Sequence, residues 1–175
     1  MAQKYLIVVD MQEDFVYGSL GSPDAQEIVA AVVKKINEFD GTIIFTKDTH
    51  DVDYLQTQEG KYLPVEHCIR GTQGWELIEP LRKLQETQNY KIYEKDTFGC
   101  VELAADLKKQ ENEIVSIEWI GVCTDICVVS NVLLVKACMP QVPMYVDAGC
   151  CAGVTKEKHE AALETMRSCQ IQMIS

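Results

Sequence analysis

The sequence of 175 residues has few aromatic residues, few basic residues and no long apolar run. Its 16 Lys and Arg residues stand against 27 Asp and Glu, which gives a formal net charge of −11. The basic residues form no cluster long enough to follow a phosphate backbone. No apolar stretch reaches the roughly 18 residues that are needed to span a bilayer. We therefore expect neither nucleic acid nor a membrane as a partner.

A secretory signal is also missing from the first residues, MAQKYLIVVDMQEDF. Their apolar run meets Asp10 too early for a signal-peptide core, and no cleavage site follows. We therefore expect a cytoplasmic protein, in which the eight cysteines remain thiols. None of them forms a CxxC pair, and we interpret the adjacent Cys150 and Cys151 as structural or incidental rather than as a redox pair.

Short apolar runs alternate with runs of helical spacing along the whole chain. Strands are expected at residues 5–9, 42–46, 91–93, 114–121, 142–146 and 171–174. Between them, Ser22 with Pro23 is typical of the start of one helix, and Thr155 is typical of the start of another. Parallel neighbours need crossover connections. The pattern therefore predicts one α/β domain over residues 1–175, with a six-stranded, mainly parallel sheet between helices on both faces, in three layers.

The stretch 114–135, IVSIEWIGVCTDICVVSNVLLV, predicts a strand, a tight turn and a helix. Thr124 and Asp125 are good N-terminal caps, which places Cys127 in the first helical turn. Free backbone N–H groups and the helix dipole favour an anion there, so we expect this thiol to ionise more easily than a free one, as a nucleophile requires. The alternative is a buried structural thiol, because cysteine is among the most buried residue types.

Asp10 and Lys95 lie, like Cys127, at or just past the carboxyl ends of expected strands, where ligands bind in parallel sheets. Desolvation would raise the pKa of Asp10, which could then take the thiol proton as a base. Lys95 would orient Asp10 and stabilise the thiolate, and the backbone N–H groups of Cys123 and Cys127 are candidate oxyanion donors. The alternative is a structural ion pair or two unrelated charges. We interpret His159 as a solvated helix residue.

The segment 47–74 shows no convincing periodicity, and a segment of this length inside a compact domain is often functional. It contains Asp48, His50, Glu59 and His67. Their carboxylate and imidazole groups suit a divalent transition metal such as zinc, manganese or iron. The spacing alone is a weak signal, and a capping aspartate with two solvated histidines is the alternative.

Three motifs resemble the signatures of the isochorismatase-like cysteine hydrolases: VVDMQEDF at 8–15, EKDTFG at 94–99 and GVCTDICV at 121–128. The resemblance covers almost the whole chain, and the order and spacing of the motifs are specific. It implies that Asp10, Lys95 and Cys127 are a catalytic triad and that Cys127 forms a thioester with the substrate. It also implies a cis peptide before Cys123, which turns that N–H towards the oxyanion.

Within this family, KDTH at 47–50 and EHCIRGTQGWEL at 66–77 resemble the metal-binding segments of nicotinamidases. The resemblance implies Asp48, His50 and His67 as metal ligands. Many nicotinamidases have a further histidine soon after the position of His50, and this chain lacks it. Glu59 lies where other members use a glutamate, so we expect it to be the fourth ligand.

The implied reaction is hydrolysis of nicotinamide to nicotinate and ammonia in NAD salvage, with pyrazinamide as a surrogate substrate. The metal would bind the pyridine nitrogen, and Phe15 and Phe98 match aromatic pocket positions. One alternative is a metal-independent amidase of the same family that acts on a carbamoyl or ureido compound. Another is a catalytically silent binding protein on this fold. The family commonly forms dimers or larger assemblies, which implies a homo-oligomer.

Overall fold

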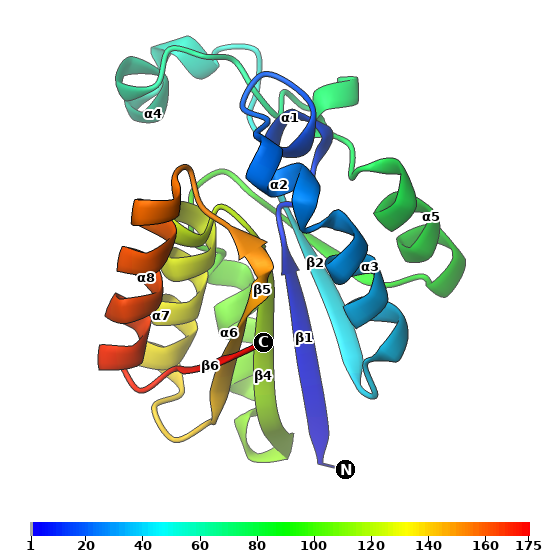
Figure 1. The fold of residues 1–175 in the computed structure, drawn as a ribbon, viewed down its shortest axis with the longest axis vertical. Helices are drawn as coiled ribbons and strands as arrows, with labels where there is room; N and C mark the ends of the chain where they lie inside the picture. The colour runs from blue at the N-terminus through cyan, green and yellow to red at the C-terminus, as the bar shows by residue number, and fades with distance from the viewer. Residues whose placement is uncertain (1) are drawn as a thin grey trace.

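A six-stranded sheet forms the middle layer of the protein in the computed structural model, which describes residues 2–175 (Figure 1). The strands are β1 (Gln3–Val9), β2 (Thr42–Asp48), β3 (Lys91–Lys95), β4 (Ile114–Val122), β5 (Met144–Ala152) and β6 (Gln172–Ile174). Their order across the sheet is β3-β2-β1-β4-β5-β6, and all neighbouring strands pair in parallel. The predicted α/β fold is confirmed, and the sheet is parallel throughout.

Helices cover both faces of this sheet. They are α1 (Glu13–Val16), α2 (Pro23–Glu27), α3 (Val29–Glu38), α4 (Gln58–Tyr62), α5 (Glu79–Gln88), α6 (Val101–Lys109), α7 (Val129–Cys138) and α8 (Lys156–Ser168). Side chains of α6, α7 and α8 share one core with Ile7 and Val9 of β1, and those of α2, α3 and α5 share the other core with Leu6 and Val8. Because both faces of β1 are covered, its sequence is a continuous apolar run rather than an alternating one.

Several element boundaries differ from the predicted ones. The helical run after Ser22 is divided at Ile28 into α2 and α3, although Ser22 does cap it by accepting a hydrogen bond from the Ala25 N–H at 3.1 Å. Strand β5 continues to Ala152 instead of ending at residue 146. Its extension contains the adjacent Cys150 and Cys151, which are buried free thiols.

The segment between β2 and α5 contains short elements that hydrophobic periodicity did not reveal. They are the 3-10 turn Tyr54–Gln56, helix α4 and the 3-10 turn Gln73–Trp75. In Figure 1, α4 lies beyond the carboxyl ends of the strands, away from the layers of the sheet and its helices. This part of the chain therefore overhangs the edge of the sheet where ligands of parallel sheets bind.

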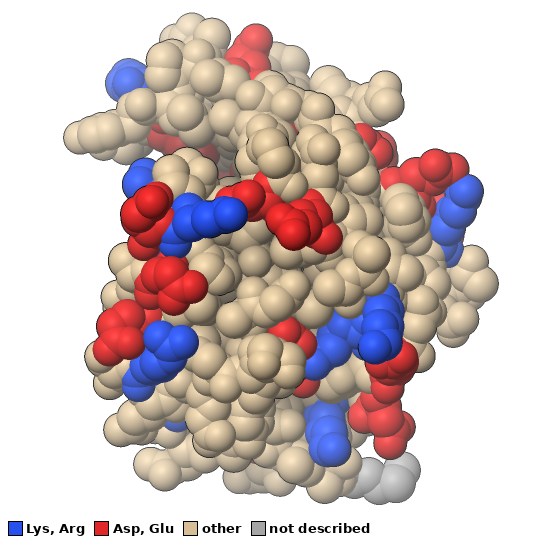
Figure 2. Space-filling model, viewed as in Figure 1, with Lys and Arg blue, Asp and Glu red and all other residues tan. Residues whose placement is uncertain are grey.

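The surface of the molecule carries interspersed charges. On the face shown in Figure 2, Lys and Arg side chains lie beside Asp and Glu side chains rather than in a separate basic area. Ion pairs on the surface include Lys83 with Glu79 at 2.6 Å and Arg82 with Glu86 at 3.1 Å. Within residues 2–175, no helix combines the length and the apolar character that crossing a membrane requires.

Candidate active site

Asp10, Lys95 and Cys127 meet at the carboxyl edge of the sheet. Asp10 follows β1, Lys95 is the last residue of β3, and Cys127 lies in the turn after β4. Lys95 Nζ is 2.6 Å from Asp10 Oδ2 and 3.5 Å from Cys127 Sγ. All three residues are buried. The fold therefore brings a carboxyl group, an ammonium group and a thiol into mutual contact, as the positions of these residues at strand ends predict.

Thr46 of β2 holds Asp10 in place through both its side chain and its backbone. Thr46 Oγ1 donates a hydrogen bond of 2.6 Å to Asp10 Oδ1, and the Asp10 N–H donates to the Thr46 carbonyl at 3.2 Å. Burial raises the pKa of Asp10, while the charge of Lys95 opposes that shift. Gly121 of β4 allows β1 to approach, since a Cβ there would lie 2.1 Å from the Val9 carbonyl oxygen.

Cys127 does not lie in the first turn of an α-helix, contrary to prediction. It belongs to a π-helical turn, Thr124–Val128, which precedes α7 and is called the Cys127 turn below. Thr124 and Asp125 are not its caps, because their side chains have partners elsewhere. Thr124 Oγ1 is hydrogen-bonded to His159 Nδ1 at 2.8 Å, and Asp125 Oδ1 accepts from the Val154 N–H at 2.8 Å. His159 is half-buried rather than solvated.

The Cys127 thiol is also harder to ionise than the sequence suggests. Burial raises its pKa well above the usual value, and the nearby charge of Lys95 lowers it by less. The expectation of an easily ionised thiol is wrong, because the sequence pattern indicates a helix terminus but does not reveal the desolvation of the sulfur. A thiol in this state needs a base to remove its proton. Asp10 is the candidate, since Lys95 Nζ contacts both its carboxylate and the Cys127 sulfur. The Val122–Cys123 peptide is cis, as the family resemblance implies.

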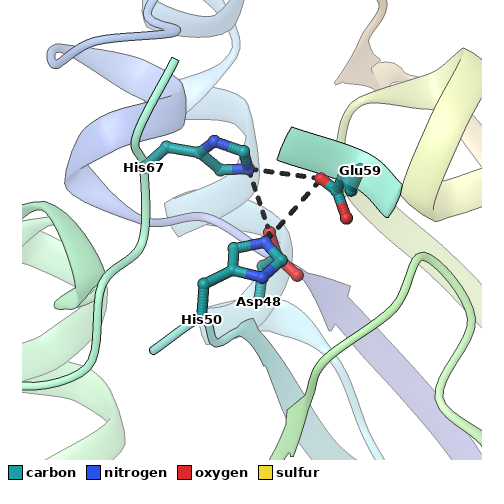
Figure 3. A group of neighbouring side chains, drawn as sticks. All are labelled: Asp48, His50, Glu59 and His67. Atoms are coloured by element: carbon teal, nitrogen blue, oxygen red, sulfur yellow. Dashed lines mark hydrogen bonds and ion pairs between the residues drawn. The ribbon is translucent and has the colours of Figure 1, made fainter. Parts of the chain in front are cut away.

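Asp48, His50, Glu59 and His67 form a second cluster (Figure 3). Their ligand atoms, two imidazole nitrogens and two carboxylate oxygens, all lie within 4.8 Å of one another. His50 Nε2 and His67 Nε2 lie 3.0 and 3.5 Å from Asp48 Oδ2, and 3.7 and 3.5 Å from Glu59 Oε1. The four side chains converge on one point from β2, the following segment and α4. This donor set and its convergence fit a divalent transition metal.

Groups around this cluster orient its donors. His67 Nδ1 is hydrogen-bonded to the Val65 carbonyl at 2.8 Å, which leaves Nε2 directed at the cluster. Burial lowers the pKa of His67, but hydrogen bonds to Asp48 and Glu59 outweigh burial and raise it to about 10. The two carboxylates thus supply negative charge that a proton on His67 or a metal cation would neutralise. Asp48 Oδ1 also lies 3.5 Å from Lys95 Nζ, so the two clusters touch.

A cavity of about 790 Å³ is lined by Cys127 and by all four residues of the cluster. Phe15 and Phe98, the two predicted pocket aromatics, line it as well. Phe15 is buried, with its ring centroid 5.5 Å from that of His67, while Phe98 is 41% exposed. Cavities of this size hold small organic ligands. A small molecule bound here can contact both the thiol and the histidine and carboxylate cluster.

Comparison with known proteins connects this arrangement with a family. Residues 4–175 match the family model described as the isochorismatase domain. The chain belongs to the isochorismatase family. Over 140 residues it is 31% identical to an isochorismatase family protein, PncA, of Bacillus subtilis (strain 168), and the match spans 72% of this chain and 74% of that protein.

Solved structures of this family resemble the whole chain. A nicotinamidase/pyrazinamidase, PncA, from Bacillus subtilis superposes with a TM-score of 0.86 at 26% identity and covers 99% of this chain and 100% of its own. A pyrazinamidase of Pyrococcus horikoshii in complex with zinc superposes with a TM-score of 0.79 at 27% identity, over 99% of each chain. These neighbours place the chain in the nicotinamidase branch of the isochorismatase family.

Two buried amides that the sequence reasoning missed support this isochorismatase-family site. Asn131 Nδ2 donates to the carbonyls of Cys127 at 2.8 Å and Phe98 at 3.0 Å, and its Oδ1 accepts from the Cys100 N–H at 2.8 Å. Gln12 pairs with the backbone of Asp48 in both directions, at 2.8 and 2.7 Å. A polar residue inside an apolar helical run, as in VVSNVLLV, is the signal that could have revealed Asn131.

Proposed function

We propose that the protein is an amidohydrolase that converts nicotinamide to nicotinate and ammonia, with Cys127 as its nucleophile. The observation that carries this proposal is one cavity that is lined both by Cys127 and by the histidine and carboxylate cluster. Lys95 is buried beside this lining, where its Nζ contacts the Cys127 sulfur and the Asp10 carboxylate. The nicotinamidase and pyrazinamidase neighbours support a heteroaromatic amide as substrate. Such an enzyme would act in NAD salvage.

In the proposed reaction Asp10 takes the proton of the Cys127 thiol, and the sulfur attacks the amide carbonyl carbon. Backbone N–H groups of Cys123 and Cys127 donate to the oxyanion. The C–N bond then breaks, Asp10 returns the proton to the leaving nitrogen, and ammonia departs from the thioester. Asp10 next takes a proton from water, and the water oxygen attacks the thioester carbon. The C–S bond breaks, Asp10 returns its proton to the Cys127 sulfur, and the acid leaves and ionises to nicotinate. Lys95 holds Asp10 and balances negative charge on the thiolate throughout.

The cluster would hold a divalent zinc, manganese or iron ion through Asp48, His50, Glu59 and His67. When bound, such an ion supplies a Lewis-acidic position that fits a pyridine nitrogen. Gln12 fixes the backbone of Asp48, so that this ligand keeps its direction. Phe15 and Phe98 would flank the ring and exclude water from it. The zinc complex of the pyrazinamidase neighbour supports a metal of this class.

We further propose that residues 1–175 form a single catalytic domain. One continuous sheet and a family match over residues 4–175 support this assignment. The triad and the cluster are both drawn from this sheet and its connections, so no second domain is needed to complete the cavity.

Ammonia release from nicotinamide by three variants tests the proposed chemistry. Cys127→Ala removes the nucleophile and is expected to lower turnover by at least about 10³-fold. Asp10→Asn keeps the shape of the side chain but cannot take the thiol proton, and it should lower turnover by about 10²-fold to 10⁴-fold. Cys169→Ala, at an exposed cysteine, is the control and should keep full activity.

Circular dichroism and thermal unfolding would check that each variant folds. Retained amide hydrolysis in folded Cys127→Ala would refute the nucleophile. Turnover of a carbamoyl or ureido compound, but not of nicotinamide, would instead identify a different amidase of the same family.

A further inference from the structure

The Cys127 turn has no side-chain cap of its own. Cys123 is its N-cap residue, and its side chain makes no capping hydrogen bond. The N–H groups of Ile126 and Val128 both donate to the Cys123 carbonyl, at 3.1 Å each. Turns of this π-helical kind are rare and frequently occur at functional sites. The placement of the nucleophile therefore depends on contacts that come from outside the turn.

The segment that leads from β5 into α8 supplies such contacts. Thr124 is fully buried, and its hydroxyl is hydrogen-bonded to His159 Nδ1 at 2.8 Å. The Asp125 carboxylate accepts a hydrogen bond from the Val154 N–H at 2.8 Å. Thr155 caps α8, which fixes the start of the helix that carries the imidazole. Two side chains of the turn thus have their partners in residues 154–159.

Gly153 allows this close contact between α8 and the turn. A Cβ at this position would lie 2.9 Å from Asp125 Oδ1 and 2.9 Å from His159 Cβ, which is closer than real Cβ atoms come. His159 is consequently half-buried, while its neighbours Lys158 and Glu160 are exposed. A buried hydroxyl such as that of Thr124 needs a hydrogen-bond partner, and His159 provides it.

We propose that His159 is a positioning residue for the nucleophile. Through the Thr124 hydroxyl it holds the Cys127 turn in register with Lys95, whose Nζ lies 3.5 Å from the thiol sulfur. This role rests on the proposed amide hydrolysis, in which the sulfur must reach both the base and the carbonyl carbon. His159 does not touch the reacting atoms, so its loss is expected to lower kcat and to leave KM nearly unchanged. A misplacement of about 1 Å can cost about 10²-fold in rate.

Substitutions at both ends of this hydrogen bond test the proposal. Thr124→Val keeps the shape of the side chain and removes the hydroxyl. His159→Ala removes the imidazole that is hydrogen-bonded to this hydroxyl. Each should lower kcat for nicotinamide by about tenfold or more, with KM within about twofold. The double variant should be no slower than the slower single variant, because both changes break the same bond.

Conservative variants separate positioning from a general loss of structure. Thr124→Ser retains the hydroxyl and should keep most of kcat. His159→Asn can place an amide near the position of Nδ1 and should recover part of it. Thr165→Val is the matched control, since it removes an exposed hydroxyl on the same helix that donates to the Ala161 carbonyl at 2.9 Å. The kcat of the Thr165→Val variant should equal that of the wild type.

Hydrogen exchange of residues 123–128 gives a readout that needs no substrate. Exchange should be faster in Thr124→Val and His159→Ala than in the wild type, and unchanged in Thr124→Ser and Thr165→Val. Absence of ammonia release by the wild type would refute the proposed substrate. The exchange result would still decide whether the hydrogen bond between Thr124 and His159 holds the Cys127 turn. Unchanged exchange, an unchanged kcat in both single variants, or losses that add in the double variant would each overturn the positioning role.

Discussion

The proposed triad and the histidine and carboxylate cluster meet at one cavity, which Cys127 and the four cluster residues line, but they are built from different parts of the fold. The triad residues follow or end β1, β3 and β4, and all of them are buried. In the cluster, Asp48 ends β2, whereas His50, Glu59 and His67 come from the segment between β2 and α5. The Glu59 side chain, on the five-residue helix α4, is 19% exposed. Strands therefore position the proposed catalytic groups, and an overhanging connection completes the cluster.

This difference predicts which substitutions should affect the proposed catalysis and which should affect metal binding. Triad side chains are held by the sheet and by buried hydrogen bonds, as for Asp10 with Thr46. The cluster depends on the closing of a connection over the edge of the sheet, and the two parts meet where Asp48 lies 3.5 Å from Lys95. Changes in the connection should affect metal binding strongly, and should leave the contact between the thiol and the ammonium group in place.

Graded substitutions in the cluster provide the largest expected effect on metal binding. His67→Ala removes a buried imidazole and should weaken zinc binding by at least about 10²-fold, because even the loss of an outer-shell partner costs about 10-fold to 100-fold. Glu59→Gln keeps a ligand oxygen on the more exposed helix and should cost only about tenfold. Competition with a chelator measures both affinities.

Glu66→Gln is the control for this series, because Glu66 is exposed in the same connection, next to His67. Its affinity for zinc should equal that of the wild type. Equal affinities in all three variants would show that the cluster does not bind the metal. A larger loss in Glu59→Gln than in His67→Ala would reverse the proposed order of the ligands.

The comparison also explains how much the sequence could predict. Asp10 and Lys95 could be placed because apolar strands end at them, and carboxyl ends of parallel strands meet at one edge. The residue types in segment 47–74 indicated the four cluster residues only weakly, and the family resemblance strengthened the grouping, since their convergence depends on how residues 49–67 fold over that edge. Spacing within a connection does not fix such geometry.

The Cys127 turn shows why other details could not be predicted. Thr124 and Asp125 look like helix caps when only their neighbours in sequence are considered. Their partners, His159 and Val154, lie about thirty residues further along the chain and come into reach only after α8 packs against the turn. The ionisation of the thiol likewise depends on burial, which a local pattern does not reveal.

The pH dependence of Cys127 alkylation is a smaller expected effect, and it tests the burial of the triad directly. Burial raises the pKa of this thiol, so the reactive thiolate is scarce near neutral pH and becomes more abundant as the pH rises. The rate constant for alkylation by iodoacetamide should therefore keep increasing from about pH 6 to about pH 9, without a plateau. Peptide mapping separates Cys127 from the exposed Cys169, which serves as an internal reference. A rate constant that is flat below about pH 8 would indicate an easily ionised thiol.

The most direct test of the whole account is metal analysis of the purified protein, paired with ammonia release from nicotinamide before and after chelation. We expect one divalent metal per chain, bound by Asp48, His50, Glu59 and His67. Chelation should abolish turnover, and returning the metal should restore it. Full turnover of nicotinamide by metal-free protein would contradict the proposed cooperation of the cluster with the triad.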